Sequence, residues 1–212
     1  MSTTALEDVA WDLEPLVDGE GEAGADRLLD EAEQRAAAFA ERYASKLGTI
    51  DGPEFAAAVQ ELAEISELVG RAGSYASLRF SVDTRDPANG ALLQRVQERG
   101  TAIETKLLFF ELEWAALSDE RAEELLAADG LEKARHHLRT ARRYRPYLLS
   151  EPEEKILAEK SVTGRDAWTR LFSEVTSAIE VELDGEEKPV PLDVALARLV
   201  SPDREVRRHV AE

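Results

Sequence analysis

The sequence of 212 residues has no cysteine, only three histidines, and only 12 glycines and 8 prolines. Without cysteine, neither a disulfide framework nor a thiolate metal site can form, and nothing indicates an oxidising compartment. The low glycine and proline content, together with 43% hydrophobic residues, is unlike that of a disordered chain. We therefore expect the chain to fold around one sizeable hydrophobic core or two small ones.

Long apolar runs and positive charge are also scarce. No stretch approaches the ~18 apolar residues that a membrane-spanning helix needs, and residues 1–8 lack the pattern of a secretion signal. Against 44 Asp and Glu there are 26 Lys and Arg, which leaves a net charge of −18. Such a charge repels nucleic acid and anionic lipid surfaces. We expect no nucleic-acid partner, no membrane partner and a cytoplasmic location.

Helical periodicity is what the sequence does contain. Apolar residues recur every three or four positions in three long stretches, which begin near residues 25, 52 and 87. Before the first stretch, the glycine-rich residues 19–24 indicate a flexible loop. The first apolar stripe comprises Leu29, Ala32, Ala36, Phe39, Tyr43 and Leu47. Gly70 and Gly73 lie inside the second stretch and favour a close helix approach or a mild kink there.

Shorter elements follow the third stretch. Residues 118–127, 131–144 and 150–162 predict shorter helices, and the alternating residues 179–183 before a turn predict a β-hairpin. The expected fold is mainly α, an antiparallel layer of long helices with shorter helices and one small β-hairpin near residues 178–191. We expect two regions, residues 1–130 with the long helices and residues 131–212 with the remaining elements. A last helix, starting after Ser201, reaches the end of the sequence without a stop signal, so the chain is expected to be cut rather than complete.

Histidines offer little for a catalytic or metal site. His136 and His137 are adjacent, so on a helix their side chains are about 100° apart and cannot reach one metal ion. His209 shares a helical face with Glu205 and Glu212, which suits either a carboxylate–histidine metal set or, as we favour, a solvated face. No carboxylate pair can be singled out among 44 acidic residues. We expect no catalytic, cofactor-binding or metal-binding residue in this chain.

A basic cluster interrupts the acidic sequence between residues 133 and 145. It contains Arg135, Arg139, Arg142, Arg143 and Arg145. The cluster could bind an anion or a peptide carboxylate, but pairing with the acidic residues 119–124 and 151–154 on either side is favoured.

Large aromatic residues fall on the apolar stripes, so we expect them in the core. They are Trp11, Phe109, Phe110, Trp114, Trp168 and Phe172.

One continuous block is distinctive, YRPYLLSEPEEKILAEK at residues 144–160 followed by SVTGRDAWTRLFSE at residues 161–174. Together with WDL at 11–13, FFELEW at 109–114, the hairpin and SPDREVRR at 201–208, it resembles the N-terminal region of the oligoendopeptidase F family of zinc peptidases. The most specific part is residues 149–172. Tyr147 departs from the family pattern, where a histidine often stands.

The resemblance implies a larger, mostly helical enzyme that encloses and hydrolyses short peptides. In that family a His-Glu-x-x-His helix and a further glutamate hold zinc, and the intervening glutamate acts as general base. No histidine here is followed by glutamate, so zinc is expected in the full-length family but not in this chain, which should be inactive alone.

The expected role is a substrate-chamber wall that partners short peptides and a C-terminal catalytic domain beyond residue 212. Weak self-association or limited stability is also expected, because the last helix and part of the apolar surface would lack their partner. The alternative is a stand-alone acidic helical scaffold or interaction module without peptidase activity.

Overall fold

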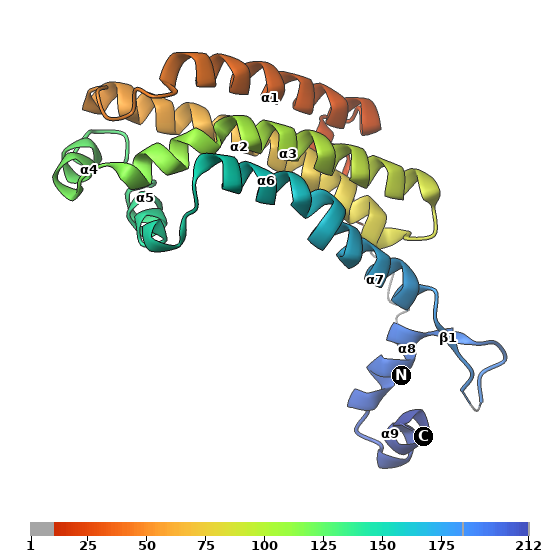
Figure 1. The fold of residues 1–212 in the computed structure, drawn as a ribbon. Coiled ribbons are helices and arrows are strands. Elements are labelled where there is room, and N and C mark those ends of the chain that lie inside the picture. Colours follow the sequence, from red (N-terminus) through yellow and green to blue (C-terminus); the bar gives the residue numbers. More distant parts are fainter. Residues whose placement is uncertain (1–10, 184, 212) are drawn as a thin grey trace, which may run out of the picture.

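A computed structural model describes residues 11–183 and 185–211. Residues 1–10, Asp184 and Glu212 lie outside the described residues. The prediction that residues 1–8 carry no secretion signal, the turn residue Asp184 of the hairpin, and Glu212 of the set with Glu205 and His209 therefore fall outside them as well. Three long helices, α1 (Gly21–Tyr43), α2 (Gly52–Val82) and α3 (Pro87–Ala116), form the body of the molecule. Consecutive helices run in opposite directions, and each packs against the other two (Figure 1). The predicted antiparallel arrangement of long helices is confirmed.

The starts of α2 and α3 follow from their sequence. The Asp51 carboxylate accepts a hydrogen bond of 2.9 Å from the backbone N–H of Glu54, and the Asp86 carboxylate accepts one of 2.9 Å from Ala88. Each cap is followed by a proline in the first turn of its helix, where the absent N–H has no intrahelical partner to lose.

The start of α1 corrects the prediction of a loop over residues 19–24 for residues 21–24, whereas residues 19 and 20 are not helical. Helix α1 begins at Gly21, whose backbone N–H donates to the Glu14 carboxylate over 3.1 Å. A Cβ at Gly24 would lie 2.3 Å from the Val17 carbonyl oxygen. The glycine is needed because the 3₁₀ turn Glu14–Val17 packs directly against the first turns of α1.

Helix α1 also ends earlier than the apolar stripe through Leu47 and the stop at Gly48 suggest. It stops at Tyr43, and Ser45 takes a left-handed conformation with φ 64°. The Glu113 carboxylate on α3 accepts hydrogen bonds from the backbone N–H groups of Ser45 and Leu47. This tertiary contact stabilises a turn where the local sequence favoured helix.

The shorter elements follow, and the predicted helices and hairpin appear among them in the expected order. The shorter elements are α4 (Asp119–Leu126), α5 (Arg135–Arg142), α6 (Glu151–Ser161), a π-helical turn (Val162–Asp166), α7 (Ala167–Ser177), β1 (Glu180–Val181), β2 (Val190–Pro191), α8 (Leu192–Ala197) and α9 (Arg204–Ala211). The π-helical turn and α7 were not predicted. Strands β1 and β2 pair antiparallel, with Glu180 opposite Pro191, so the predicted hairpin is confirmed. Helix α5 is shorter than residues 131–144, because residues 131–134 form a turn and Arg145–Tyr147 form a 3₁₀ turn containing Pro146.

Most of the core lies between the three long helices. All six residues of the first predicted stripe are buried, and Leu125, Leu126, Leu131 and Leu138 close one end. Among the described residues after Leu138, the buried hydrophobic side chains are Leu183 and Ala195. Residues 144–211 thus contribute little core of their own, and α8 and α9 project away from the long helices (Figure 1).

The aromatic residues are divided between core and surface. Trp114, Phe109 and Phe110 are buried as predicted, and Trp114 stacks on Phe55 with ring centroids 5.0 Å apart. The core prediction was wrong for Trp11, Trp168 and Phe172, which are 82%, 70% and 67% exposed. Periodicity identifies a face to be buried, but in the described chain the apolar side of α7 stays largely exposed.

Ion pairs connect the long helices across their surfaces. Arg35 on α1 contacts Glu61 and Glu64 on α2 at 2.9 and 2.6 Å. Arg99 on α3 contacts Asp30 and Glu33 on α1 at 2.6 and 2.9 Å. No helix among the described residues is both long and apolar enough to cross a membrane.

Candidate functional site

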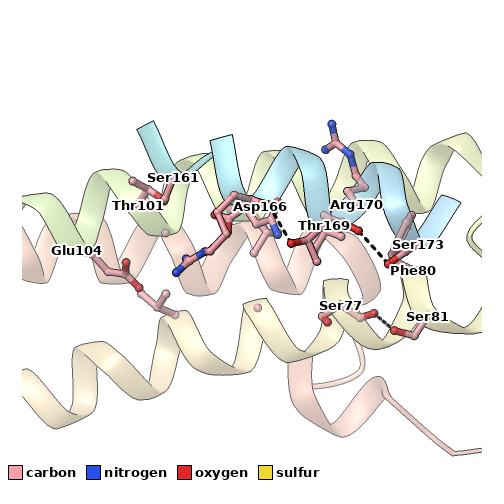
Figure 2. Close-up of a pocket in the computed structure, with 17 residues that line it drawn as sticks. Ser77, Phe80, Ser81, Thr101, Glu104, Ser161, Asp166, Thr169, Arg170 and Ser173 are labelled. Carbon is pink, nitrogen blue, oxygen red and sulfur yellow. Dashed lines mark hydrogen bonds and ion pairs between the residues drawn. The ribbon is translucent and has the colours of Figure 1, made fainter. Parts of the chain in front are cut away.

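A groove of about 600 Å³ lies between α2 and α3 on one side and the segment from the end of α6 to α7 on the other (Figure 2). Its lining is mixed in polarity and includes Ser77, Phe80, Ser81, Leu93, Val96, Thr101, Glu104, Ser161, Arg165, Asp166, Thr169, Arg170 and Ser173. Figure 2 shows Glu104 toward one end of this polar groove and Phe80 and Ser81 toward the other.

Small residues keep the polar groove open. Gly73 lines it, and a Cβ at Gly73 or at Gly70 would meet no heavy atom within 4 Å. Of the two alternatives at these glycines, the close helix approach was therefore wrong, and the mild kink stays a prediction. The close neighbour is instead at Gly100 on α3, where a Cβ would lie 3.5 Å from Cγ1 of Val69.

Two carboxylates, of Glu104 and Asp166, and two guanidinium groups, of Arg165 and Arg170, line the polar groove. Asp166 pairs with the Arg165 guanidinium at 3.0 Å. Burial raises the pKa of Glu104 above its ordinary value, and the nearby negative charge of Asp166 raises that pKa further. Glu104 thus holds a proton more readily than an ordinary glutamate and can accept or donate hydrogen bonds in the groove.

The hydroxyl groups in the polar groove are already oriented by their own helices. The Thr169 hydroxyl donates to the Arg165 carbonyl at 2.9 Å, and the Ser81 hydroxyl donates to the Ser77 carbonyl at 2.9 Å. Each oxygen keeps acceptor capacity after this donation. The groove therefore offers hydrogen-bond acceptors that suit backbone N–H groups of a peptide.

A second groove, about 720 Å³ in volume, lies between α2, α3, α5 and α6 and is predominantly apolar. Its lining includes Val59, Leu62, Leu107, Leu108, Phe110, Trp114, Leu138 and Ala158. Glu104 lines this apolar groove as well as the polar one, so the two surfaces meet at its side chain. Apolar walls with few polar groups are typical of small-ligand sites.

The π-helical turn Val162–Asp166 places Asp166 and the start of α7 beside the polar groove. It interrupts an otherwise helical run from Glu151 to Ser177 and lies within the distinctive residues 149–172. Such turns change which side of a helix faces its neighbour and occur often at functional sites.

The helix start before that turn is structural. The Ser150 backbone N–H donates to the Glu153 carboxylate at 3.0 Å, and the Ser150 hydroxyl donates to the same carboxylate. These hydrogen bonds lower the pKa of Glu153. Leu149 donates its backbone N–H to Glu154 at 2.9 Å. The conspicuous Ser-Glu-Pro-Glu-Glu segment thus fixes the beginning of α6.

The basic cluster pairs mainly with the first of its two acidic neighbours, as favoured from the sequence. Arg139 contacts Glu123 at 2.6 Å, and Arg142 and Arg145 contact Asp119 at 2.7 and 3.4 Å. Arg135 donates to backbone carbonyls instead. The pairing predicted with residues 151–154 is replaced by other contacts, such as the ion pair of Glu151 with Lys155 at 2.6 Å.

The three histidines are not brought together. His136 and His137 are exposed on α5, and His137 borders the apolar groove. His209 lies on α9, where Glu205 pairs with Arg208 at 2.6 Å. Within residues 11–183 and 185–211, no three His, Asp or Glu side chains are grouped to hold a metal ion. The absence of a zinc site remains a prediction.

Glu104 and Asp166 were missed from the sequence because they are distant in the chain and resemble many other acidic residues. Only the unusual Val-Thr-Gly-Arg-Asp segment of the distinctive block drew attention to one of them.

Comparisons with known proteins agree with the resemblance. Residues 113–180 match a family model described as Oligopeptidase F, and this range includes the distinctive residues 149–172. A comparison with curated proteins found no match. The fold is similar to the crystal structure of oligoendopeptidase-F from Enterococcus faecium, with a TM-score of 0.68 and 22% sequence identity.

That alignment covers 94% of this chain and 37% of the Enterococcus faecium chain. This chain therefore shares its fold with little more than a third of the Enterococcus faecium chain. The resemblance to the N-terminal portion of oligoendopeptidase F is confirmed, by sequence over residues 113–180 and by fold over most of the chain.

Proposed function

We propose that this chain is the N-terminal, non-catalytic part of a zinc-dependent oligoendopeptidase and forms one wall of the chamber that receives short peptides. The observation that carries the proposal is the family match over residues 113–180, a range that includes one side of the polar groove, from Ser161 to Ser173. The similar fold of a protein titled oligoendopeptidase-F supports it. A cytoplasmic location and the division into residues 1–130 and 131–212 remain part of this proposal.

The two grooves suit an extended peptide. In the polar groove, Glu104 and the oriented hydroxyls of Thr169 and Ser81 can accept hydrogen bonds from peptide N–H groups. In the adjoining apolar groove, side chains such as Leu62 and Leu107 can contact apolar peptide side chains. The residues of this chain would bind and orient a substrate rather than cleave it.

The proposal places zinc outside this chain, since no three His, Asp or Glu side chains among the described residues are grouped to hold a metal ion. In the proposed enzyme the metal would polarise the peptide carbonyl from a site on another part of the protein. No step of the reaction is assigned to a metal held by this chain.

The coding sequence beyond Glu212 provides the first test. An in-frame His-Glu-x-x-His motif is expected, and the protein that includes it should hydrolyse a quenched oligopeptide in a zinc-dependent manner, whereas the 212-residue chain should not. Zinc-dependent hydrolysis by the pure 212-residue chain would contradict the non-catalytic role. A stop codon directly after Glu212 would favour the alternative, a stand-alone helical interaction module, which the exposed apolar side of α7 also suits.

A further inference from the structure

Helix α7 contacts the body of the protein through its polar side. Thr169, Arg170 and Ser173 line the polar groove, and Arg170 donates to the side-chain oxygen of Gln94 on α3 at 3.3 Å. At the end of the helix, the Ser177 and Thr84 hydroxyl oxygens are 2.6 Å apart. The side that a soluble helix normally turns to water is here turned inward.

The opposite side of α7 is apolar and faces solvent. Trp168, Leu171, Phe172 and Val175 follow the spacing i, i+3, i+4 and i+7, so they share one helical face, called here the α7 face. These four side chains are 70%, 45%, 67% and 54% exposed. Two large aromatic rings on one exposed stripe are typical of an interface, since aromatic residues dominate the binding energy of interfaces.

The neighbouring segments do not cover this face. In the described chain, most large exposed hydrophobic residues lie after residue 143, including Ile156, Leu157 and Val200 at 57%, 56% and 86% exposure. An 11-residue helix is marginal without tertiary packing of its apolar side. Burial of the α7 face therefore requires a surface from another polypeptide segment.

We propose that the α7 face is the surface on which the polypeptide following residue 212 docks, as the catalytic part of the longer peptidase. This inference rests on the proposed function. Two observations support it. This chain covers only 37% of a chain of similar fold, and the exposed apolar residues gather in the last third of the 212 residues. A second copy is a poorer occupant, because each copy carries a net charge of −18.

The natural absence of cysteine allows a direct test by maleimide labelling. Val175→Cys places a thiol on the α7 face, and Glu120→Cys places a control thiol at an exposed position of α4, far from that face in the sequence. Each variant is made in the 212-residue chain and in the longer protein read from the gene, and mass spectrometry locates the label. We expect Val175→Cys to react at least about tenfold more slowly in the longer protein, and Glu120→Cys to react equally in both.

The possible results separate this inference from the proposed function. Equal labelling of Val175→Cys in both proteins, while the longer one cleaves peptides, would overturn the docking surface and leave the proposed function intact. A longer protein that protects Val175→Cys but lacks peptidase activity would support docking and contradict the enzymatic role. A stop codon directly after Glu212 would overturn both.

Sedimentation of the 212-residue chain at the labelling concentration tests the competing occupant. If the thiol of Val175→Cys is protected from maleimide in that chain, and the chain sediments as a dimer that the Trp168→Ser substitution dissociates, a second copy covers the α7 face. That result would overturn the proposal.

Discussion

Replacing Arg142 with methionine should destabilise the junction where α3, α4 and α5 meet. The side chain is only 9% exposed. Its guanidinium donates hydrogen bonds to the carbonyl oxygens of Trp114 and Leu117 and to the Asp119 carboxylate, the last two at 2.7 Å. It also lies 5.3 Å from the centroid of the Trp114 ring, which donates its indole N–H to the Leu138 carbonyl at 2.9 Å.

The expected loss comes mainly from the two carbonyl groups. Both belong to the end of α3, where no following turn of helix supplies a donor. Leaving a buried acceptor without its partner costs about 1–3 kcal/mol, and two acceptors are affected. Because water can replace part of the lost hydrogen bonding at the Leu117 carbonyl, Arg142→Met should lower the free energy of unfolding by about 2–4 kcal/mol. For a protein of this size, that corresponds to a fall in Tm of about 5–15 °C.

Urea unfolding, followed by circular dichroism and by the fluorescence of the buried Trp114, measures the effect. Arg143→Met is the matched control, because Arg143 is the adjacent arginine and is exposed, so its replacement should change stability by less than about 0.5 kcal/mol. Arg142→Lys keeps the charge but not the planar fork and should fall between the two. Equal stabilities of Arg142→Met and Arg143→Met would refute the reasoning.

The destabilisation should also depend on pH. Arg142 and Arg145 lower the pKa of Asp119 below its ordinary 3.8. A carboxylate with a lowered pKa in the folded state stabilises the protein above its unfolded pKa, and this contribution is lost as the pH falls through the folded value. The difference between the wild type and Arg142→Met should therefore narrow below about pH 4.

Three further outcomes are expected. Glu104→Gln should raise the thermal midpoint at pH 7, because the raised pKa of Glu104 costs stability as the pH rises above its unfolded value of 4.5; an advantage that stays constant from pH 4 to 8 would contradict this. Gly24→Ala should destabilise the protein by about 1–3 kcal/mol through the clash with Val17, whereas Gly70→Ala, with open space around it, should stabilise it by up to about 1 kcal/mol; urea midpoints of both variants decide. Raising KCl from 0.1 to about 1 M should increase the thermal midpoint. The shorter screening length weakens the repulsion within a chain of charge −18 more than it weakens ion pairs in direct contact. A falling midpoint would show that the ion pairs dominate.

The sequence predicted the elements that depend on local chemistry. Asp51 and Asp86 mark helix starts through their own side chains, and the stripe from Leu29 to Leu47 identified buried positions correctly. It failed where distant residues intervene. Glu113 lies on α3 and accepts a hydrogen bond from the backbone N–H of Leu47, in the turn that follows α1. No pattern in the local sequence indicates that contact.

The candidate site could not be predicted in the same way. Glu104 is distinguished only by its burial and by Asp166, which the π-helical turn brings near from 62 positions away. The stripe of Trp168 and Phe172 was recognised, but amphipathicity does not specify which polypeptide covers the apolar side. The same pattern describes a core helix and a docking helix.

The uneven distribution of buried residues has a consequence for synthesis on the ribosome. Nearly all described core side chains precede residue 139, and most of them come from three consecutive helices, α1, α2 and α3, which pack on one another. Domains fold as they emerge, and helical units with local contacts fold fast. The body formed by α1, α2 and α3 should therefore be folded while α6 to α9 are still being synthesised. Helix α7 then emerges beside a folded surface, with its aromatic side chains still available to contact segments synthesised later.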